Sequence, residues 1–169
     1  MLVGLPGAGK STLSSALAKR VDGLRVLNKD EVRHALFDPC DYTAAERSIS
    51  FAAMLDAARY HLGRGRVVVL DGLALQRPGE AEAVAEAAAE CGAFVATIVC
   101  DVPVDVAMAR ADADVAAGVH RATNRDGSAV RRLATEMREP AGDYLTVDMT
   151  GDIELAADEV LGYIEEAAQ

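Results

Sequence analysis

The sequence predicts an α/β fold in three layers, in which a five-stranded parallel sheet is covered by helices on both faces. Two observations favour this fold: short aliphatic runs alternate with longer periodic segments, and no repeat, low-complexity tract or linker divides the chain. With 169 residues, of which 51% are hydrophobic, the chain can bury an ample core. We therefore expect a single domain, residues 1–169.

Five aliphatic runs are expected to form the strands, at residues 1–5, 24–28, 67–71, 94–100 and 144–148. The third run, VVVLD, is unbroken and ends in an acid, which is typical of a strand buried on both faces. The first run has barely three residues before a glycine-rich loop, fewer than the usual five or six of a central strand.

The periodic segments between these runs predict helices at about 11–20, 43–65, 104–116, 130–138 and from 152 onward. In the helix at 43–65 we expect Ile49, Ala52, Leu55 and Leu62 to face inward. The Ala-rich, acidic segment 80–90 is interpreted as a solvated helix. The polar, basic stretch GVHRATNRDG lacks apolar periodicity, and we expect it to belong to a mobile lid at about 111–130.

Composition excludes several classes of protein. The net charge of −10 disfavours a general affinity for nucleic acid, although a local basic groove is compatible with it. No apolar run is long enough to span a bilayer, and no signal peptide is recognisable at the start. The three cysteines have no metal-like spacing, so we expect reduced thiols, small core side chains and a cytoplasmic location.

The stretch GLPGAGKST, residues 4–12, has the pattern Gly, four residues, Gly, Lys, Ser between a predicted strand and a predicted helix. This pattern predicts a phosphate-binding loop, because glycines let several N–H groups converge at a helix N-terminus. We expect Lys10 to reach the β and γ phosphates of ATP, Ser11 to ligate Mg²⁺ and Thr12 to approach the α phosphate. The predicted nucleotide-binding residues of the loop are Gly7, Ala8, Gly9, Lys10, Ser11 and Thr12.

Three further residues lie at predicted strand ends, where ligands bind in open parallel sheets. Asp30 and Arg33 follow the second strand and lie one helical turn apart. We expect Asp30 to act as the general base and Arg33 to bind the acceptor. The alternative for Asp30 is that it caps the helix. Asp71 ends the third strand and is the candidate second acid near Mg²⁺. His34 is a candidate for lining the acceptor pocket.

Positive charge for the transferred phosphoryl group is expected from the lid. Arg121 and Arg125 are the catalytic candidates there, whereas Arg131 and Arg132 are expected to be surface charges. The segment NKDE at 28–31 resembles a guanine-reading motif, but it follows the second strand, where guanine would be out of reach. ATP is therefore the expected nucleotide.

The ordered set GLPGAGKST, NKDEVR, GRVVVLDG, IVCDVPVDVAMAR and REPAGDYLTVD resembles the P-loop kinases, a group that includes 5′-hydroxyl polynucleotide kinase domains, zeta toxins, chloramphenicol phosphotransferase and small AAA-type bacterial kinases. The resemblance implies a P-loop NTPase fold with an arginine-bearing lid. It also implies that Asp30 is the general base, that Arg33 binds the acceptor and that Arg110, Arg121 or Arg125 lies over ATP. The loop at 150–152 would border adenine.

Together these features predict an ATP- and Mg²⁺-dependent phosphotransferase that moves the γ phosphate to a hydroxyl group of a small molecule. Two alternatives stay open: a 5′-hydroxyl polynucleotide kinase, and a regulatory or toxin-like protein that binds ATP.

Overall fold

The computed structural model describes residues 1–75, 77, 79–118 and 126–168. Its strands are β1 (Leu2–Val3), β2 (Arg25–Asn28), β3 (Val68–Asp71), β4 (Ile98–Asp101) and β5 (Leu145–Asp148). All the pairs are parallel, in one ladder of β1, β4 and β5 and another of β2 and β3. A single parallel bridge between Val3 and Leu73 joins the two ladders. The resulting order is β2-β3-β1-β4-β5, which confirms the predicted parallel sheet.

The helices of the described residues agree closely with the periodic segments of the sequence. They are α1 (Lys10–Arg20), α2 (Lys29–Leu36), α3 (Ala44–Leu62), α4 (Glu80–Ala89), α5 (Val104–Ala116), α6 (Gly127–Glu136) and α7 (Ile153–Ala167). Local chemistry determines where several of them begin. At α3, Thr43 and Glu46 form a reciprocal capping box, and Asp126 caps α6 by accepting a hydrogen bond from the Ala129 N–H.

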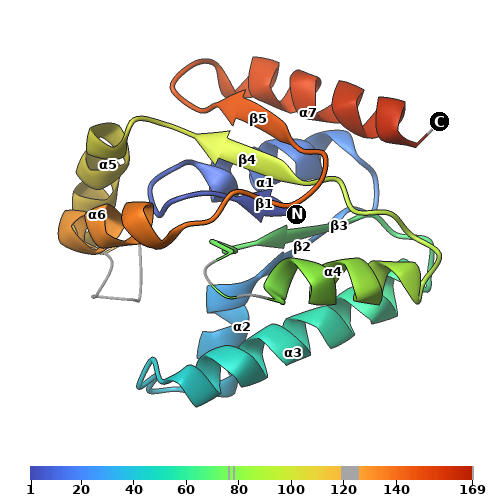
Figure 1. Cartoon of the computed structure of the whole chain (residues 1–169), viewed down its shortest axis with the longest axis horizontal. Helices are drawn as coiled ribbons and strands as arrows, with labels where there is room; N and C mark the ends of the chain where they lie inside the picture. Colours follow the sequence, from blue (N-terminus) through green and yellow to red (C-terminus); the bar gives the residue numbers. More distant parts are fainter. Residues whose placement is uncertain (76, 78, 119–125, 169) are drawn as a thin grey trace.

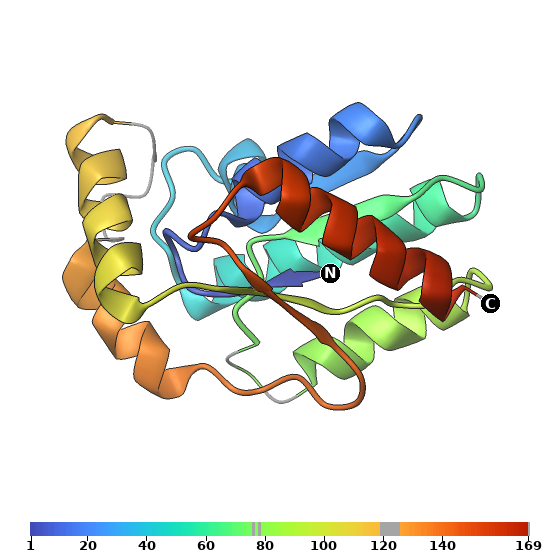
Figure 2. The same cartoon turned by 90° about the horizontal axis from the view of Figure 1, so that it is seen from above.

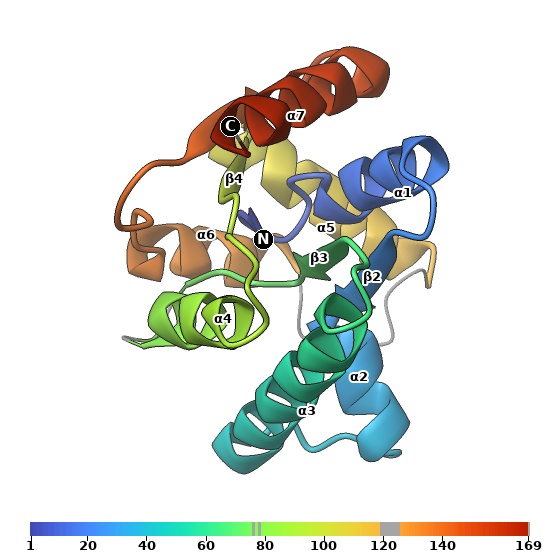
Figure 3. The same cartoon turned by 90° about the vertical axis from the view of Figure 1, so that its right-hand side faces the viewer.

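The helices cover both faces of the sheet (Figure 1). Helices α1 and α7 pack together on one face, while α3 and α4 lie on the other (Figure 3). Two clusters of buried side chains correspond to these faces: Leu13 and Val160 belong to the cluster under α1 and α7, and Met54 and Val84 to the cluster under α3 and α4. Helices α5 and α6 form a pair at the end toward which the strands point (Figure 2).

Two expectations about helix faces are wrong. In α3, the expectation holds for Leu55, which is buried, but Ile49 is 52% exposed and Ala52 is also exposed, whereas Met54 and Ala58 face the core. This helix contacts α2 and α4 as well as the sheet, and that packing rotates its buried stripe away from the most apolar positions. Helix α4 is not solvated all round, because its Val84 is buried in the core.

The expectation that the cysteines are core side chains holds only for Cys100, which is buried, because Cys40 and Cys91 are partly exposed. Cys40, Cys91 and Cys100 are all within the described residues and all are free thiols. Burial raises the pKa of the Cys100 thiol to about 12, so this side chain stays neutral at physiological pH. Among the helices that the structure describes, none has the length and apolar content needed to cross a membrane.

Candidate active site

The glycine-rich loop runs from β1 to the first residue of α1, Lys10. Its turns require glycine, because Gly7 and Gly9 have φ of 78° and 83°. A Cβ on Gly7 would also lie 2.3 Å from the backbone oxygen of Ala107 in α5. The loop therefore packs directly against α5. Its conformation is restricted by this contact as well as by the turns at its own glycines.

Replacing Gly7 with alanine is expected to destabilise the fold by about 2–4 kcal/mol and to weaken nucleotide binding. The left-handed conformation costs about 1–2 kcal/mol for a residue with a Cβ, and the contact with Ala107 forces the loop or α5 to move. Urea denaturation and titration with a fluorescent ATP analogue would measure the two effects.

A matched control for this variant is Gly23→Ala. Gly23 has a similar φ of 73°, but a Cβ there would meet no atom within 4 Å. The difference between the two variants therefore isolates the contact with α5. Equal destabilisation of both would contradict the idea that this contact fixes the loop.

Lys10 and Ser11 begin α1 and point their polar atoms toward different partners. The Lys10 ammonium donates hydrogen bonds to the carbonyl oxygens of Gly4 and Leu5, each at 2.8 Å. The Ser11 hydroxyl donates to Oδ2 of Asp71 at 2.7 Å. The first helical residue thus supplies a cation, and the second links the loop to the end of β3.

Asp71 is 1% exposed, and three donors hold its carboxylate. Besides Ser11, the Asn28 amide donates to Oδ2 at 2.9 Å and the Gly72 N–H donates to Oδ1 at 2.6 Å. These bonds tie together the ends of β2 and β3 and the start of α1. Such a buried carboxylate, held by donors on both oxygens, is rigidly positioned.

Asn28 is a site residue that the sequence reasoning missed. Its side-chain oxygen accepts hydrogen bonds from the N–H groups of Asp30 and Glu31, so Asn28 rather than Asp30 is the N-cap of α2. Asn28 was considered only as part of a guanine-reading motif. The signal that could have identified it is an Asn directly before an acidic first helical turn.

Because Asn28 caps α2, the alternative role of Asp30 as the helix cap does not apply. Asp30 lies 3.7 Å from the guanidinium of Arg33, measured from Oδ1 to Nη1, one turn further along the helix. Arg33 is only 6% exposed, and its guanidinium carbon lies 5.6 Å from the centre of the Tyr42 ring. The predicted base and the predicted acceptor ligand are therefore neighbours.

Arg110 in α5 links the glycine loop to the loop after β5. Its Nη2 donates to the Met149 carbonyl at 3.1 Å, and its Nη1 lies 3.5 Å from the Gly7 carbonyl. In the β5 loop, hydrogen bonds from the Thr150 hydroxyl and N–H lower the pKa of Asp148. This loop is where the family resemblance implies the border of adenine.

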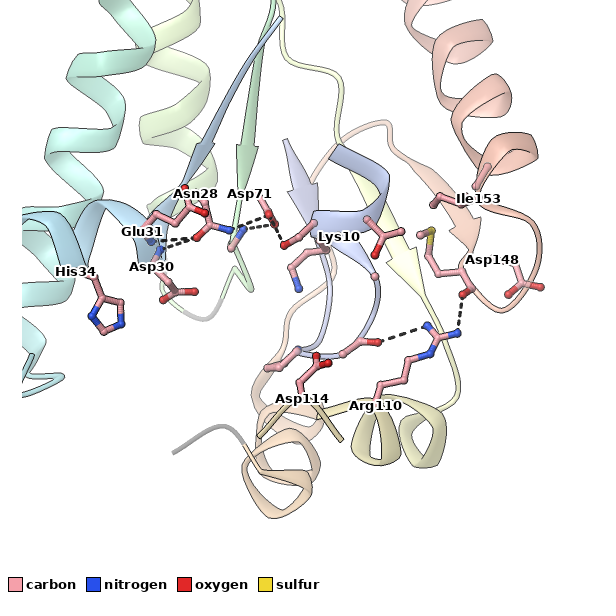
Figure 4. Close-up of a pocket in the computed structure, with 18 of the residues that line it drawn as sticks. Lys10, Asn28, Asp30, Glu31, His34, Asp71, Arg110, Asp114, Asp148 and Ile153 are labelled. Atoms are coloured by element: carbon pink, nitrogen blue, oxygen red, sulfur yellow. Dashed lines mark hydrogen bonds between the residues drawn. The ribbon is translucent and has the colours of Figure 1, made fainter. Parts of the chain in front are cut away.

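A cavity of about 970 Å³ collects most of these side chains. In Figure 4, Asn28, Asp30 and Asp71 lie on one side of it, Arg110 and Asp148 on the other, and Lys10 between them. The predicted site residues that line the cavity are Gly7, Gly9, Lys10, Ser11, Thr12, Asp30, Asp71 and Arg110, and His34 and Gly151 line it as well.

Two of the predicted residues that the structure describes, Ala8 and Arg33, are not part of this lining. Ala8 is fully buried and donates its backbone N–H to the Leu5 carbonyl at 3.1 Å, beneath the loop. Arg33 lines a second, smaller cavity that shares Lys10 with the first. Arg121 and Arg125, the lid candidates, lie outside the described residues, as does the middle of the predicted lid; its flanks are the end of α5 and the start of α6.

Comparison with known proteins gives one sequence match. The sequence profile of a family described as AAA domain matches residues 1–140, most of the chain. No curated protein matches the sequence.

Several solved structures have a similar fold. An APS kinase from Mycobacterium tuberculosis, in complex with AMPPNP and APS, superposes with a TM-score of 0.72 at 21% identity, over 97% of this chain and 95% of its own. A putative kinase from Chloroflexus aurantiacus gives a TM-score of 0.74 at 21% identity, over 98% and 95%. A gluconokinase from Sinorhizobium meliloti gives 0.67 at 19% identity, over 99% and 91%. At these identities, the similarity establishes the fold.

Proposed function

Because this chain belongs to the AAA domain family, we propose that it is a P-loop kinase that transfers the γ phosphate of ATP, with Mg²⁺, to a hydroxyl group of a small molecule. One observation carries the proposal: the cavity of about 970 Å³ is lined by a phosphate-loop lysine and serine and by two carboxylates from neighbouring strand ends. A phosphate cradle next to a well-placed acid is the minimum that phosphoryl transfer to an alcohol requires.

The glycine loop and α1 supply the triphosphate site. Backbone N–H groups at the start of α1 and the partial positive charge of the helix favour an anion there. Lys10 would exchange its hydrogen bonds to Gly4 and Leu5 for bonds to phosphate oxygens. The loop after β5, with Met149 and Gly151 lining the cavity, is the proposed border of the adenine base.

Ser11 and Asp71 fit a magnesium ion. Mg²⁺ prefers hard oxygen ligands, and the Ser11 hydroxyl and the Asp71 carboxylate are 2.7 Å apart at the edge of the phosphate loop. When bound, the metal would offset negative charge on the phosphates. The protein contributes by holding Asp71 rigidly, through the Asn28 amide and the Gly72 N–H.

Asp30 is the proposed general base. Its carboxylate would accept the proton of the acceptor hydroxyl as the oxygen attacks the γ phosphorus and the bond to the β–γ bridging oxygen breaks. Asp30 lines the cavity from α2, and Figure 4 places it on the side opposite Arg110, across Lys10. A base on one side and the nucleotide on the other is the arrangement that in-line transfer requires.

Incubation with ATP labelled on its γ phosphate and fractions of a metabolite extract would test the proposal. We expect label to enter a small molecule only when a hydroxyl compound is present. Labelling of 5′-hydroxyl oligonucleotides would instead support a polynucleotide kinase. Release of inorganic phosphate with no labelled product in any fraction would support an ATP-binding regulatory protein and contradict the proposed function.

Replacing Asp71 with asparagine is expected to raise the Mg²⁺ concentration for half-maximal activity about 10- to 100-fold, the usual effect of losing an anchoring carboxylate near a metal. The added amide protons would also face the Ser11 hydroxyl and the Asn28 amide, which are both donors to Asp71. Activity and the binding of an ADP analogue would both be followed as functions of Mg²⁺ concentration.

The control for Asp71 is Asp101→Asn, since Asp101 also ends a strand, β4, but is exposed and does not line the cavity. Its Mg²⁺ dependence should match that of the natural chain. An unchanged dependence for Asp71→Asn would refute the metal role of Asp71.

A further inference from the structure

The second cavity, of about 160 Å³, lies beside the first and is unusually rich in cations. Five basic side chains line it, from the phosphate loop, α2, α3 and α6: Lys10, Lys29, Arg33, Arg47 and Arg132. The whole chain has 27 acidic residues and only 17 Lys and Arg, so a cavity lined by five basic side chains has the opposite charge to the chain as a whole. In the described part of the chain, no carboxylate lines this cavity.

Within this cluster, Arg33 has a buried donor without an acceptor. Arg33 is 6% exposed and lines this cavity, and its Nε makes no hydrogen bond to any described residue. A buried N–H without an acceptor is destabilising, and several like charges near one another repel. A bound anion would accept a hydrogen bond from Arg33 and would also reduce the repulsion between the positive charges.

Lys29 supports the same conclusion. Burial lowers the pKa of this lysine; nearby Glu80 and Asp30 raise it, and Arg47 and Arg33 lower it again. The two arginines are thus close enough for their charge to act on Lys29. An anion in the cavity would offset the repulsion and the burial penalty together.

The two cavities meet at the proposed reaction centre. Both cavities are lined by Lys10, Pro6 and Gly72. Asp30, which lines the larger cavity, forms an ion pair with Arg33, which lines the smaller one. Gly72, with φ of 84°, has no side chain to separate them. A molecule could therefore have one group in the smaller cavity and another beside Asp30.

We propose that the smaller cavity is an anion-binding subsite, and that the phosphoryl acceptor carries a phosphate, sulfate or carboxylate group that binds there while its hydroxyl lies beside Asp30. This inference rests on the proposed kinase function. The volume is below the roughly 300 Å³ at which pockets for drug-sized ligands begin, so it suits one charged group of the acceptor rather than a whole molecule.

Calorimetric titration with inorganic sulfate, inorganic phosphate and acetate would test the subsite, on the full chain first saturated with AMPPNP and Mg²⁺. Saturation removes the rival occupant, which is the γ phosphate itself. We expect at least one of these anions to bind in a saturable manner. The anion that binds, whether sulfate, phosphate or acetate, would define the charged group of the acceptor. Chloride at equal ionic strength serves as the reference.

Arg47→Gln and Arg132→Gln should each weaken that binding about 10-fold or more, since hydrogen bonds to charged groups are strong. Neither residue is fully buried, so both variants should fold, and thermal unfolding would verify this. The control is Arg131→Gln, which removes an exposed charge beside Arg132 on α6 and does not line either cavity. Its anion affinity should stay within about twofold of the natural chain.

The outcomes separate the two proposals. AMPPNP binding without saturable anion binding, or with anion binding that Arg47→Gln and Arg132→Gln leave unchanged, would overturn the subsite and leave the kinase function intact. Anion binding that depends on these arginines in a chain that does not bind AMPPNP would support the subsite and overturn the kinase function.

Discussion

Replacing Lys10 with methionine is expected to lower kcat/KM for phosphoryl transfer about 10³-fold, equivalent to about 4 kcal/mol of transition-state stabilisation. Methionine is similar in length and keeps most of the packing, but it cannot place a positive charge among phosphate oxygens. Lys10 lines both cavities and supplies the cation of the glycine loop, so its charge would be lost from the proposed phosphate site. Steady-state kinetics with the labelled acceptor would measure the loss.

The matched control is Lys19→Met, which removes a lysine from the exposed face near the end of α1. Its kinetics should stay close to those of the natural chain, and both variants should unfold at similar temperatures. If Lys10→Met kept more than about a tenth of the activity, the loop would not be the phosphate cradle that its sequence predicts.

Replacing Asp30 with asparagine is expected to lower kcat about 10²- to 10⁴-fold, the usual range for loss of a general base. The affinity for AMPPNP should change by less than about threefold, because Asp30 lies on α2 and not on the phosphate loop. An asparagine cannot accept the proton from the acceptor hydroxyl, although its shape is nearly the same. Rapid-quench kinetics would separate the transfer step from binding.

Asp22→Asn is the control for this variant, because Asp22 is exposed and does not line either cavity. A second check is that Asn28, not Asp30, caps α2, so the helix should remain intact in Asp30→Asn. Full turnover of Asp30→Asn with the true acceptor would show that the base is another group.

The sequence predicts the strands well because each lies within an aliphatic run, and β2, β3, β4 and β5 end in a polar residue. The run VVVLD became β3 with its terminal Asp71 buried at the site, since a central parallel strand has little choice of partner. Helix faces were harder to predict. Periodicity favoured Ile49 as a core residue of α3, but packing against α2 and α4 buries Met54 and Ala58 instead.

The same distinction applies to the site. Lys10 and Ser11 follow from one short motif, and Asp30 and Asp71 from the rule that ligands bind at the carboxyl ends of parallel strands. Arg132 is exposed, as expected of a surface charge, and it also lines the smaller cavity together with Arg47, more than eighty positions earlier in the chain. No local pattern predicts that these two residues lie together, because it is the position of α6 at the end toward which the strands point that brings Arg132 near Arg47 (Figure 2).

The single bridge between Val3 and Leu73 has an evolutionary consequence. The ladder of β1, β4 and β5 leads into the loops and helices proposed to grip ATP, whereas β2 and β3 lead into the proposed base and the anion subsite. The bond from Ser11 to Asp71 and the position of Lys10 in both cavities couple the two groups at the site, whereas substitutions in the second group away from these contacts should have nearly independent energetic effects. Descendants of one ancestral protein could therefore acquire new substrates by altering one half of the sheet while inheriting the other half unchanged.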